Sequence, residues 1–212
     1  MIRRLGGLVS GGGRTVANLL ERIERDRIPA RIEVVIAHRE DIAAVPRLRA
    51  LGLRVEVIPA PRSGVVGEDD LGDRIDAMLE SCGVDLVLLA GYLRRFRVGR
   101  RWIDRAINIH PALLPDFGGP GFYGLRVHQA VLAAGRRESG CTVHWVDERY
   151  DHGEVILQRR CAVLPGDTPE SLAARVFAEE REALPEAVRR IALGLRPTAA
   201  RGADRSGGDR PR

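Results

Sequence analysis

Two different patterns of apolar and polar positions alternate along the first 110 residues. Short, mostly apolar runs predict strands over residues 5–10, 31–37, 53–58, 85–90 and 106–110. Between them, apolar residues at every third or fourth position predict helices over residues 15–28, 42–51 and 71–81. This alternation predicts an α/β fold: a Rossmann-like, open, mostly parallel twisted sheet with helices on both faces.

The pattern of apolar and polar residues changes after residue 110. Residues 111–126 contain three Pro and four Gly, which predicts a long structured loop. A short helix over 127–134 and strands over 141–146 and 155–163 follow. Thr168, a good N-cap before Pro169, opens a last helix that ends near residue 193. We therefore predict a single domain over residues 1–195.

Length and charge narrow the class of protein. At 212 residues and 23.3 kDa, the chain suits one sizeable core. Its net charge of +5 is concentrated in residues 196–212, which hold five Arg and two Asp without apolar periodicity, so we predict a disordered Arg/Gly-rich tail. The nearly balanced remainder argues against a nucleic-acid partner. No apolar run approaches the ~20 residues of a membrane span, so no membrane is expected.

The sequence lacks residues and spacings that several catalytic mechanisms and metal sites require. The sequence has no Lys, and all 34 of its basic residues are Arg. Schiff-base catalysis, pyridoxal phosphate anchoring and a Walker-A loop all need a Lys. The three Cys form no CxxC pair and the His form no HxH or HxxxH cluster, so we expect no metal site. An odd number of Cys in apolar contexts favours free thiols in a reducing cytoplasm.

Two polar residues interrupt the apolar strand predicted over 106–110. Alternation places Asn108 and His110 on one face of this strand and Ile107 and Ile109 on the other. Ligand crevices in open α/β sheets lie at the carboxyl ends of strands, where these two residues fall. An amide and an imidazolium both donate hydrogen bonds, so the pair could form an oxyanion site. A hydrogen-bonded core pair is the alternative that this segment leaves open.

Asp151 lies in an acidic turn just before Gly153 and after the strand predicted over 141–146. From there its carboxylate could reach back to an imidazole. A carboxylate partner raises the pKa of a histidine, which would favour the cation near neutral pH. The alternative is an Asp that bonds only the backbone of its own turn.

Asn108, His110 and Asp151 fall within two longer sequence motifs. Residues 140–156 read Gly-x-Thr-Val-x-Trp-Val-x-Glu-x-Tyr-Asp-x-Gly-x-x-Ile, which resembles the signature of the folate-dependent formyltransferases. Residues 108–115 resemble that family's Asn-x-His-Pro-Ser-Leu-Leu-Pro motif, with Ala112 in place of Ser. The turn Ser-Gly-Gly-Gly-Arg-Thr over 10–15 resembles that of the glycinamide ribonucleotide branch, although it departs from the usual Asn-Gly-Ser-Asn. The resemblance covers roughly residues 2–193.

The resemblance implies a reaction as well as a fold. A cytoplasmic enzyme of purine biosynthesis would transfer the formyl group of 10-formyltetrahydrofolate to the amine of glycinamide ribonucleotide, without metal or covalent intermediate. Asn108 and His110 would hold the formyl oxygen as it becomes an oxyanion, with His110 donating a proton. Asp151 would keep His110 protonated and help relay the proton from the amine. Such an enzyme would take small-molecule substrates and act as a monomer or homodimer.

The resemblance also assigns binding residues. The ribonucleotide would contact Gly13, Arg14, Thr15 and Glu180, with the backbone amides of the Gly-rich turn around its phosphate. The folate would contact two segments and the catalytic residues, namely Leu93, Arg94, Arg95, Phe96, Asn108, Asp147, Glu148, Arg149, Tyr150 and Asp151. Arg94 is the expected partner of the folate carboxylate. A plain strand-to-helix turn at Gly13 and a solvated Glu180 are the bland alternatives.

Other reactions share the same three catalytic residue types. A formyltetrahydrofolate deformylase would hydrolyse the same donor, but it resembles a longer chain with a domain before residue 1. A formyltransferase acting on another amine is also open, and the one that acts on methionyl-tRNA would carry a basic domain after about residue 195. A non-catalytic nucleotide-binding module on the same scaffold is the remaining alternative.

Overall fold

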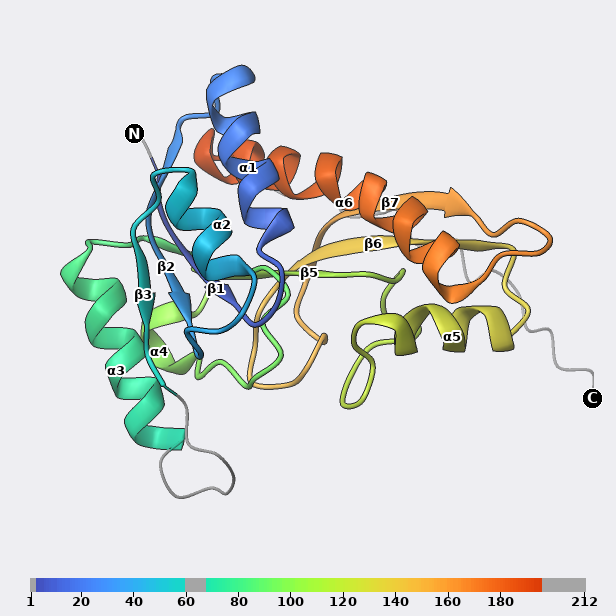
Figure 1. The fold of residues 1–212 in the computed structure, drawn as a ribbon, viewed down its shortest axis with the longest axis horizontal. Helices are drawn as coiled ribbons and strands as arrows, with labels where there is room; N and C mark the ends of the chain where they lie inside the picture. The colour runs from blue at the N-terminus through green and yellow to red at the C-terminus, as the bar shows by residue number, and fades with distance from the viewer. Residues whose placement is uncertain (1–2, 60–67, 196–212) are drawn as a thin grey trace, which may run out of the picture.

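A single seven-stranded sheet organises the molecule (Figure 1). The computed structural model describes residues 3–59 and 68–195. The strand order is β3-β2-β1-β4-β5-β6-β7. The first five strands in this order are parallel to one another, β6 is antiparallel to β5, and β7 is antiparallel to β6. The strands are β1 (Arg3–Val9), β2 (Ala30–Ala37), β3 (Val55–Val57), β4 (Leu86–Leu89), β5 (Ala106–His110), β6 (Glu138–Trp145) and β7 (Val155–Ala162).

Helices cover both faces of this sheet. They are α1 (Arg14–Arg25), α2 (Ala44–Ala50), α3 (Glu68–Ser81), α4 (Gly99–Trp102), α5 (Leu125–Ala133) and α6 (Pro169–Ala192). Core residues of α1, α2 and α6 pack on one face, and those of α3 and α4 pack on the other. The short α5 packs against α6. None of the helices in the described part of the chain has the length and apolar character needed to cross a membrane.

The predicted fold class is confirmed, and most elements begin and end within a few residues of the expected positions. Thr168 caps the start of α6 and Pro169 occupies the first turn, as the sequence predicted. The structure adds a reciprocal capping box between Thr168 and Ser171. The one-turn helix α4 was not predicted, because four residues carry no periodicity. The predicted tail at 196–212 lies outside the described residues, so the domain boundary at 195 stays a prediction.

Strand β5 directs its apolar side chains toward the core and its polar side chains toward the opposite face of the sheet, as the alternation of residue types predicted. Ile107 and Ile109 are buried in the core cluster shared with α6. The intervening polar residues face the other way, where Asn108 lies opposite His144 and His110 lies opposite Thr142 on β6. Because β5 is flanked by strands on both sides, these polar side chains are held on a rigid support.

Candidate active site

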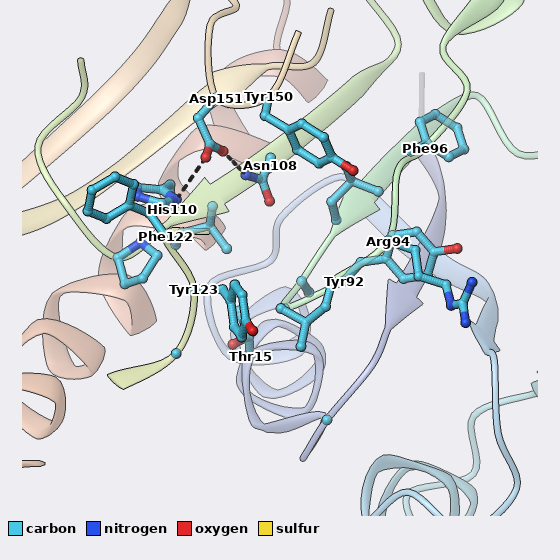
Figure 2. A pocket seen from close by; sticks show the side chains of 18 of the residues that line it. Thr15, Tyr92, Arg94, Phe96, Asn108, His110, Phe122, Tyr123, Tyr150 and Asp151 are labelled. Carbon is cyan, nitrogen blue, oxygen red and sulfur yellow. Dashed lines mark hydrogen bonds and ion pairs between the residues drawn. The ribbon is translucent and has the colours of Figure 1, made fainter. Parts of the chain in front are cut away.

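A cavity of about 660 Å³ opens at the carboxyl ends of β1, β4 and β5 (Figure 2). This volume is typical of pockets for ligands of small-molecule size. Its walls come from the Gly-rich turn before α1, the loop after β4, the end of β5, segment 119–125, the turn after β6 and one face of α6. The predicted site residues from all these segments line this one cavity, including Glu180 on α6.

Asn108, His110 and Asp151 meet at the centre of the cavity. Nδ2 of Asn108 donates to Oδ1 of Asp151 at 3.1 Å, and Nδ1 of His110 lies 3.4 Å from Oδ2 of the same carboxylate. Figure 2 shows the carboxylate between the two side chains, with a dashed line to each. The backbone of Asp151 is left-handed, with φ 53, so the turn after β6 bends sharply at this residue. The three residues therefore form one connected group.

His144 completes the hydrogen bonding of Asn108. Its Nδ1 lies 2.8 Å from the carbonyl oxygen of Trp145, which can only accept, so Nδ1 carries the proton. Nε2 is then the acceptor for the second amide hydrogen of Asn108, at 3.1 Å. Because His144 is 2% exposed, this arrangement is shielded from water. His144 orients the amide of Asn108 from behind.

The protonation of His110 is fixed by a similar argument. Nε2 lies 2.8 Å from the carbonyl oxygen of Phe117, so Nε2 carries a proton. Nδ1, beside Asp151, is the nitrogen that gains or loses the second proton. The cation therefore places its new charge directly against the carboxylate.

Burial and charge shift the pKa values of this pair. Burial opposes ionisation of Asp151, but the charge of His110 and the amide of Gly119 together hold the pKa of Asp151 below its usual value. Burial lowers the pKa of His110, and neither Asp151 nor the carbonyl of Phe117 restores it fully. The carboxylate acts on the pKa of His110 in the expected direction, but the loss of water outweighs it, so the expectation that the cation is favoured near neutral pH is wrong for the free enzyme.

The Gly-rich turn forms one end of the cavity. Gly13 is left-handed, with φ 68, and α1 begins at the next residue without a side-chain cap on its first amides. Uncapped amides at a helix N-terminus attract anions. Helix α2 holds the turn from outside, because the amide of Ala44 donates to Gly11 O at 3.0 Å and the guanidinium of Arg47 bonds Gly12 O. A Cβ on Gly13 would come within 2.9 Å of Ala44 Cβ, so this close approach requires Gly.

Arg14 and Glu180 face each other across this end of the cavity. The guanidinium of Arg14 lies 4.4 Å from the centroid of the Phe177 ring, which is a cation–π distance. Burial raises the pKa of Glu180 from its usual 4.5 to about 7, and the charge of Arg14 opposes this. The partial burial of Glu180 and its raised pKa argue against the alternative of a fully solvated residue.

The loop after β4 and the turn after β6 form the other end. The amide of Leu93 donates to Ser10 Oγ at 3.0 Å, which ties this loop to the Gly-rich turn. Arg95 reaches Glu148 across the opening at 3.4 Å. Leu93 and Tyr150 are exposed for 59% and 50% of their surface, so two apolar groups stand at the rim.

The predicted folate residues do not all present their side chains in the same way. Phe96 borders the cavity but is 6% exposed and packs with Trp102 in the core beneath α3, so its side chain supports the loop. The carboxylate of Asp147 forms hydrogen bonds inside the turn, with the amide of Arg149 and with Nδ1 of His152 at 3.0 Å. These two residues shape the wall of the cavity from behind.

One wall of the cavity was not predicted from the sequence. Residues 119–125, including Phe122 and Tyr123, line the cavity beside the catalytic group. The predicted long loop contained them, but a Gly- and Pro-rich segment has no periodicity from which its direction could be read. His128 on α5 also lines the cavity, is 4% exposed and has no partner for its Nδ1 within the described ranges.

No group of three or more His, Cys, Asp or Glu side chains in residues 3–59 and 68–195 could hold a metal ion. The three Cys are free, and burial raises the pKa of the Cys141 thiol far above its usual value. Nucleophilic use of this thiol is therefore disfavoured. The chemistry of the cavity is carried by the amide, imidazole and carboxylate groups described above.

Comparisons with known proteins agree with this geometry. Residues 3–188 match the family described as Formyl transferase. A phosphoribosylglycinamide formyltransferase of Haemophilus influenzae is 31% identical over 186 residues, which are 87% of this chain and 84% of that protein. A chloroplastic phosphoribosylglycinamide formyltransferase of Vigna unguiculata is 40% identical over 88% of this chain, and the chain spans 60% of that relative's length.

A solved structure shares the fold closely. The glycinamide ribonucleotide transformylase 1 of Symbiobacterium toebii superimposes with a TM-score of 0.82 at 38% identity, over 91% of this chain and 89% of that one. The phosphoribosylglycinamide formyltransferase of Brucella melitensis gives a TM-score of 0.80 at 35% identity, over 92% and 98% of the two chains. Sequence and structure therefore agree on the same relatives.

Proposed function

Because the chain belongs to the formyl transferase family, we propose that it transfers the formyl group of 10-formyltetrahydrofolate to the amine of 5'-phosphoribosylglycinamide, a step of de novo purine biosynthesis. The observation that carries this proposal is the connected group of Asn108, His110 and Asp151 between an anion-binding turn and a rim of aromatic and apolar residues. A phosphorylated acceptor fits the first end, and a donor with a flat ring fits the second.

The reaction needs a group that stabilises negative charge on the formyl oxygen. The amine attacks the formyl carbon, and the carbonyl oxygen becomes an oxyanion before the folate nitrogen leaves. Asn108 donates to this oxygen by exchanging one of its two amide hydrogen bonds, to His144 or to Asp151, for one to the substrate, and the bond that remains holds the amide in place. Such preorganised donors typically contribute ~10²–10³ in rate each.

Proton movement falls to His110 and Asp151. The His110 cation stabilises the developing oxyanion by its positive charge, since its two N–H groups already bond the carbonyl oxygen of Phe117 and face Asp151, and the adjacent carboxylate stabilises this cation. Asp151 has a lowered pKa and is ionised at neutral pH, so it helps to relay the proton that leaves the attacking amine. The reaction needs no covalent enzyme intermediate.

The two ends of the cavity bind the two substrates. The amides of Gly13, Arg14 and Thr15 hold the phosphate, and Glu180 contacts the ribose or amine side of the same substrate. The donor lies between the loop 93–96 and the turn 147–151, with Arg94 on its carboxylate tail. These assignments are supported by the position of every one of these residues on the cavity wall.

The remaining predictions concern partners and location. The enzyme acts on small molecules as a monomer or homodimer, without nucleic acid, membrane or metal. The free cysteines support a cytoplasmic location. The chloroplastic location named for the Vigna unguiculata relative is a property of that protein.

An assay with both substrates tests the function. Purified protein is mixed with 10-formyltetrahydrofolate, and product formation is followed by absorbance with and without 5'-phosphoribosylglycinamide. Turnover that requires the ribonucleotide supports the proposal. Donor breakdown without it indicates a deformylase, and absence of turnover with this acceptor while another amine is formylated indicates a different transferase.

A further inference from the structure

The loop after β5 reaches both members of the His110–Asp151 pair through its backbone. The carbonyl oxygen of Phe117 accepts from Nε2 of His110 at 2.8 Å. Two residues later, the amide of Gly119 donates to Oδ2 of Asp151 at 2.9 Å. That oxygen is also the one that lies 3.4 Å from Nδ1 of His110. One short segment therefore holds the imidazole from one side and its carboxylate from the other.

The segment fits tightly against the carboxylate. A Cβ on Gly118 would lie 3.2 Å from Asp151 Cβ and 2.4 Å from the end of the Leu114 side chain. Phe117 itself is left-handed, with φ 56, a conformation that bulky residues rarely adopt without external contacts. The position of the segment is thus imposed by what surrounds it.

Contacts with the core, with Phe122 of the cavity wall and with Arg136 supply that support. The ring of Phe117 packs against the core cluster and makes an edge contact with Phe122 at 6.4 Å between centroids. The guanidinium of Arg136 lies 5.6 Å from the Phe117 ring and pairs with Asp116 at 2.6 Å. Arg136 therefore binds the segment at two adjacent residues.

We propose that segment 116–119, anchored by the Asp116–Arg136 ion pair, positions His110 for catalysis by keeping the first proton of its ring on Nε2. The second proton then binds at Nδ1, beside Asp151. Asp116, Phe117 and Arg136 are positioning residues, since their side chains lie behind the cavity wall. The kinetic part of this inference rests on the proposed function, whereas the protonation part does not.

The groups around His110 determine the direction of the effect. Asp151, His144 and His128 are the titratable groups that face it among the described residues. Burial lowers the pKa of His110, while Asp151 and then the Phe117 carbonyl oppose this and His144 adds to it. Loss of the hydrogen bond to Phe117 should therefore lower the pKa of His110 further and release the proton from Nε2.

The test is a nitrogen-15 NMR titration of the histidine rings in the full chain, together with kcat and KM. Arg136→Gln and Asp116→Asn remove the anchor, and Phe117→Gly removes the ring. Arg160→Gln is the matched control, because it breaks the Arg160–Glu138 pair of similar exposure, 3.1 Å apart, on the neighbouring strands. Phe117→Tyr keeps the ring and serves as the conservative replacement.

We expect the wild type and the control to carry the neutral-ring proton of His110 on Nε2. In the anchor variants the pKa of His110 falls, the two neutral forms mix, and kcat drops about twofold to fivefold with KM unchanged, in keeping with an exposed pair. Phe117→Gly gives a larger drop, which Phe117→Tyr restores. Unchanged His110 signals in all three disrupted variants overturn the inference. An inactive wild type with a normal His110 titration overturns only the proposed function.

Discussion

The centre of the cavity and its phosphate end are built on opposite principles. At the centre, Asn108, His110 and Asp151 are side chains buried on or beside rigid strands, and each is held by at least one hydrogen bond or ion pair from the protein. At the phosphate end, the groups offered to a ligand are backbone amides of an exposed turn and two side chains on facing helices, Arg14 and Glu180.

This difference separates chemistry from binding. A preorganised centre acts on the transition state, so its loss should lower kcat. An open turn with uncapped amides and a nearby guanidinium holds an anion equally in ground and transition states, so its loss should raise KM. Three substitutions test this division, in order of decreasing effect, and a fourth tests the burial of Glu180 at the phosphate end.

Asn108→Ala is the strongest test of the catalytic end. Removing the amide takes away the preorganised donor to the oxyanion, so kcat should fall ~10²–10³-fold with little change in KM. Steady-state kinetics measures this, and circular dichroism checks the fold. Asn18→Ala serves as the control: this amide joins α1 to α6 through Arg181, so stability should fall while kcat stays within a few-fold. A comparable loss of kcat in the control would contradict the division.

Asp151→Asn removes the charge and keeps the shape. We expect kcat to fall about a hundredfold, because the cation at His110 loses its stabilising partner. The pKa of His110 should also fall below its wild-type value, since Asp151 is the largest influence that raises it. Near-normal turnover in a well-folded variant would remove Asp151 from the mechanism.

Arg14→Gln tests the phosphate end. The KM for the ribonucleotide should rise about tenfold to hundredfold, the usual cost of a charged hydrogen bond, with kcat nearly unchanged. Arg25→Gln is the matched control at the far end of α1, where the side chain forms ion pairs with Glu21 and Asp26. A fall in kcat without a rise in KM would break the comparison.

Glu180→Gln gives the smallest effect and is seen in stability. Burial raises the pKa of Glu180 from 4.5 to about 7, so the folded protein holds this proton more tightly than the unfolded chain. The resulting stabilisation is complete below about pH 4.5 and is lost as the pH rises through about 7. The melting temperature of the variant should therefore decline less between pH 5 and pH 8 than that of the wild type. Parallel declines would show that Glu180 titrates as an exposed residue.

Strand alternation and motif spacing predicted the catalytic end well. The bounds of β5, the shared face of Asn108 and His110, and the reach of Asp151 all follow from residue patterns that sequence displays directly. The helix start at Thr168 was equally visible, because capping depends on neighbouring residues.

Other features depend on contacts that no local pattern encodes. The direction of segment 119–125 is set by hydrogen bonds to Asp151 and by packing around Phe117. The low pKa of His110 depends on how deeply the ring is buried, which the folded packing alone determines. The supporting role of Phe96 likewise follows from its contact with Trp102.

Calorimetric titration of 5'-phosphoribosylglycinamide alone, without the formyl donor, separates binding from chemistry most directly. We expect that Asn108→Ala binds the ribonucleotide within about twofold of the wild type, whereas Arg14→Gln binds it at least about tenfold more weakly. Weak binding by Asn108→Ala together with normal binding by Arg14→Gln would contradict the assignment of chemistry to the centre and anchoring to the turn.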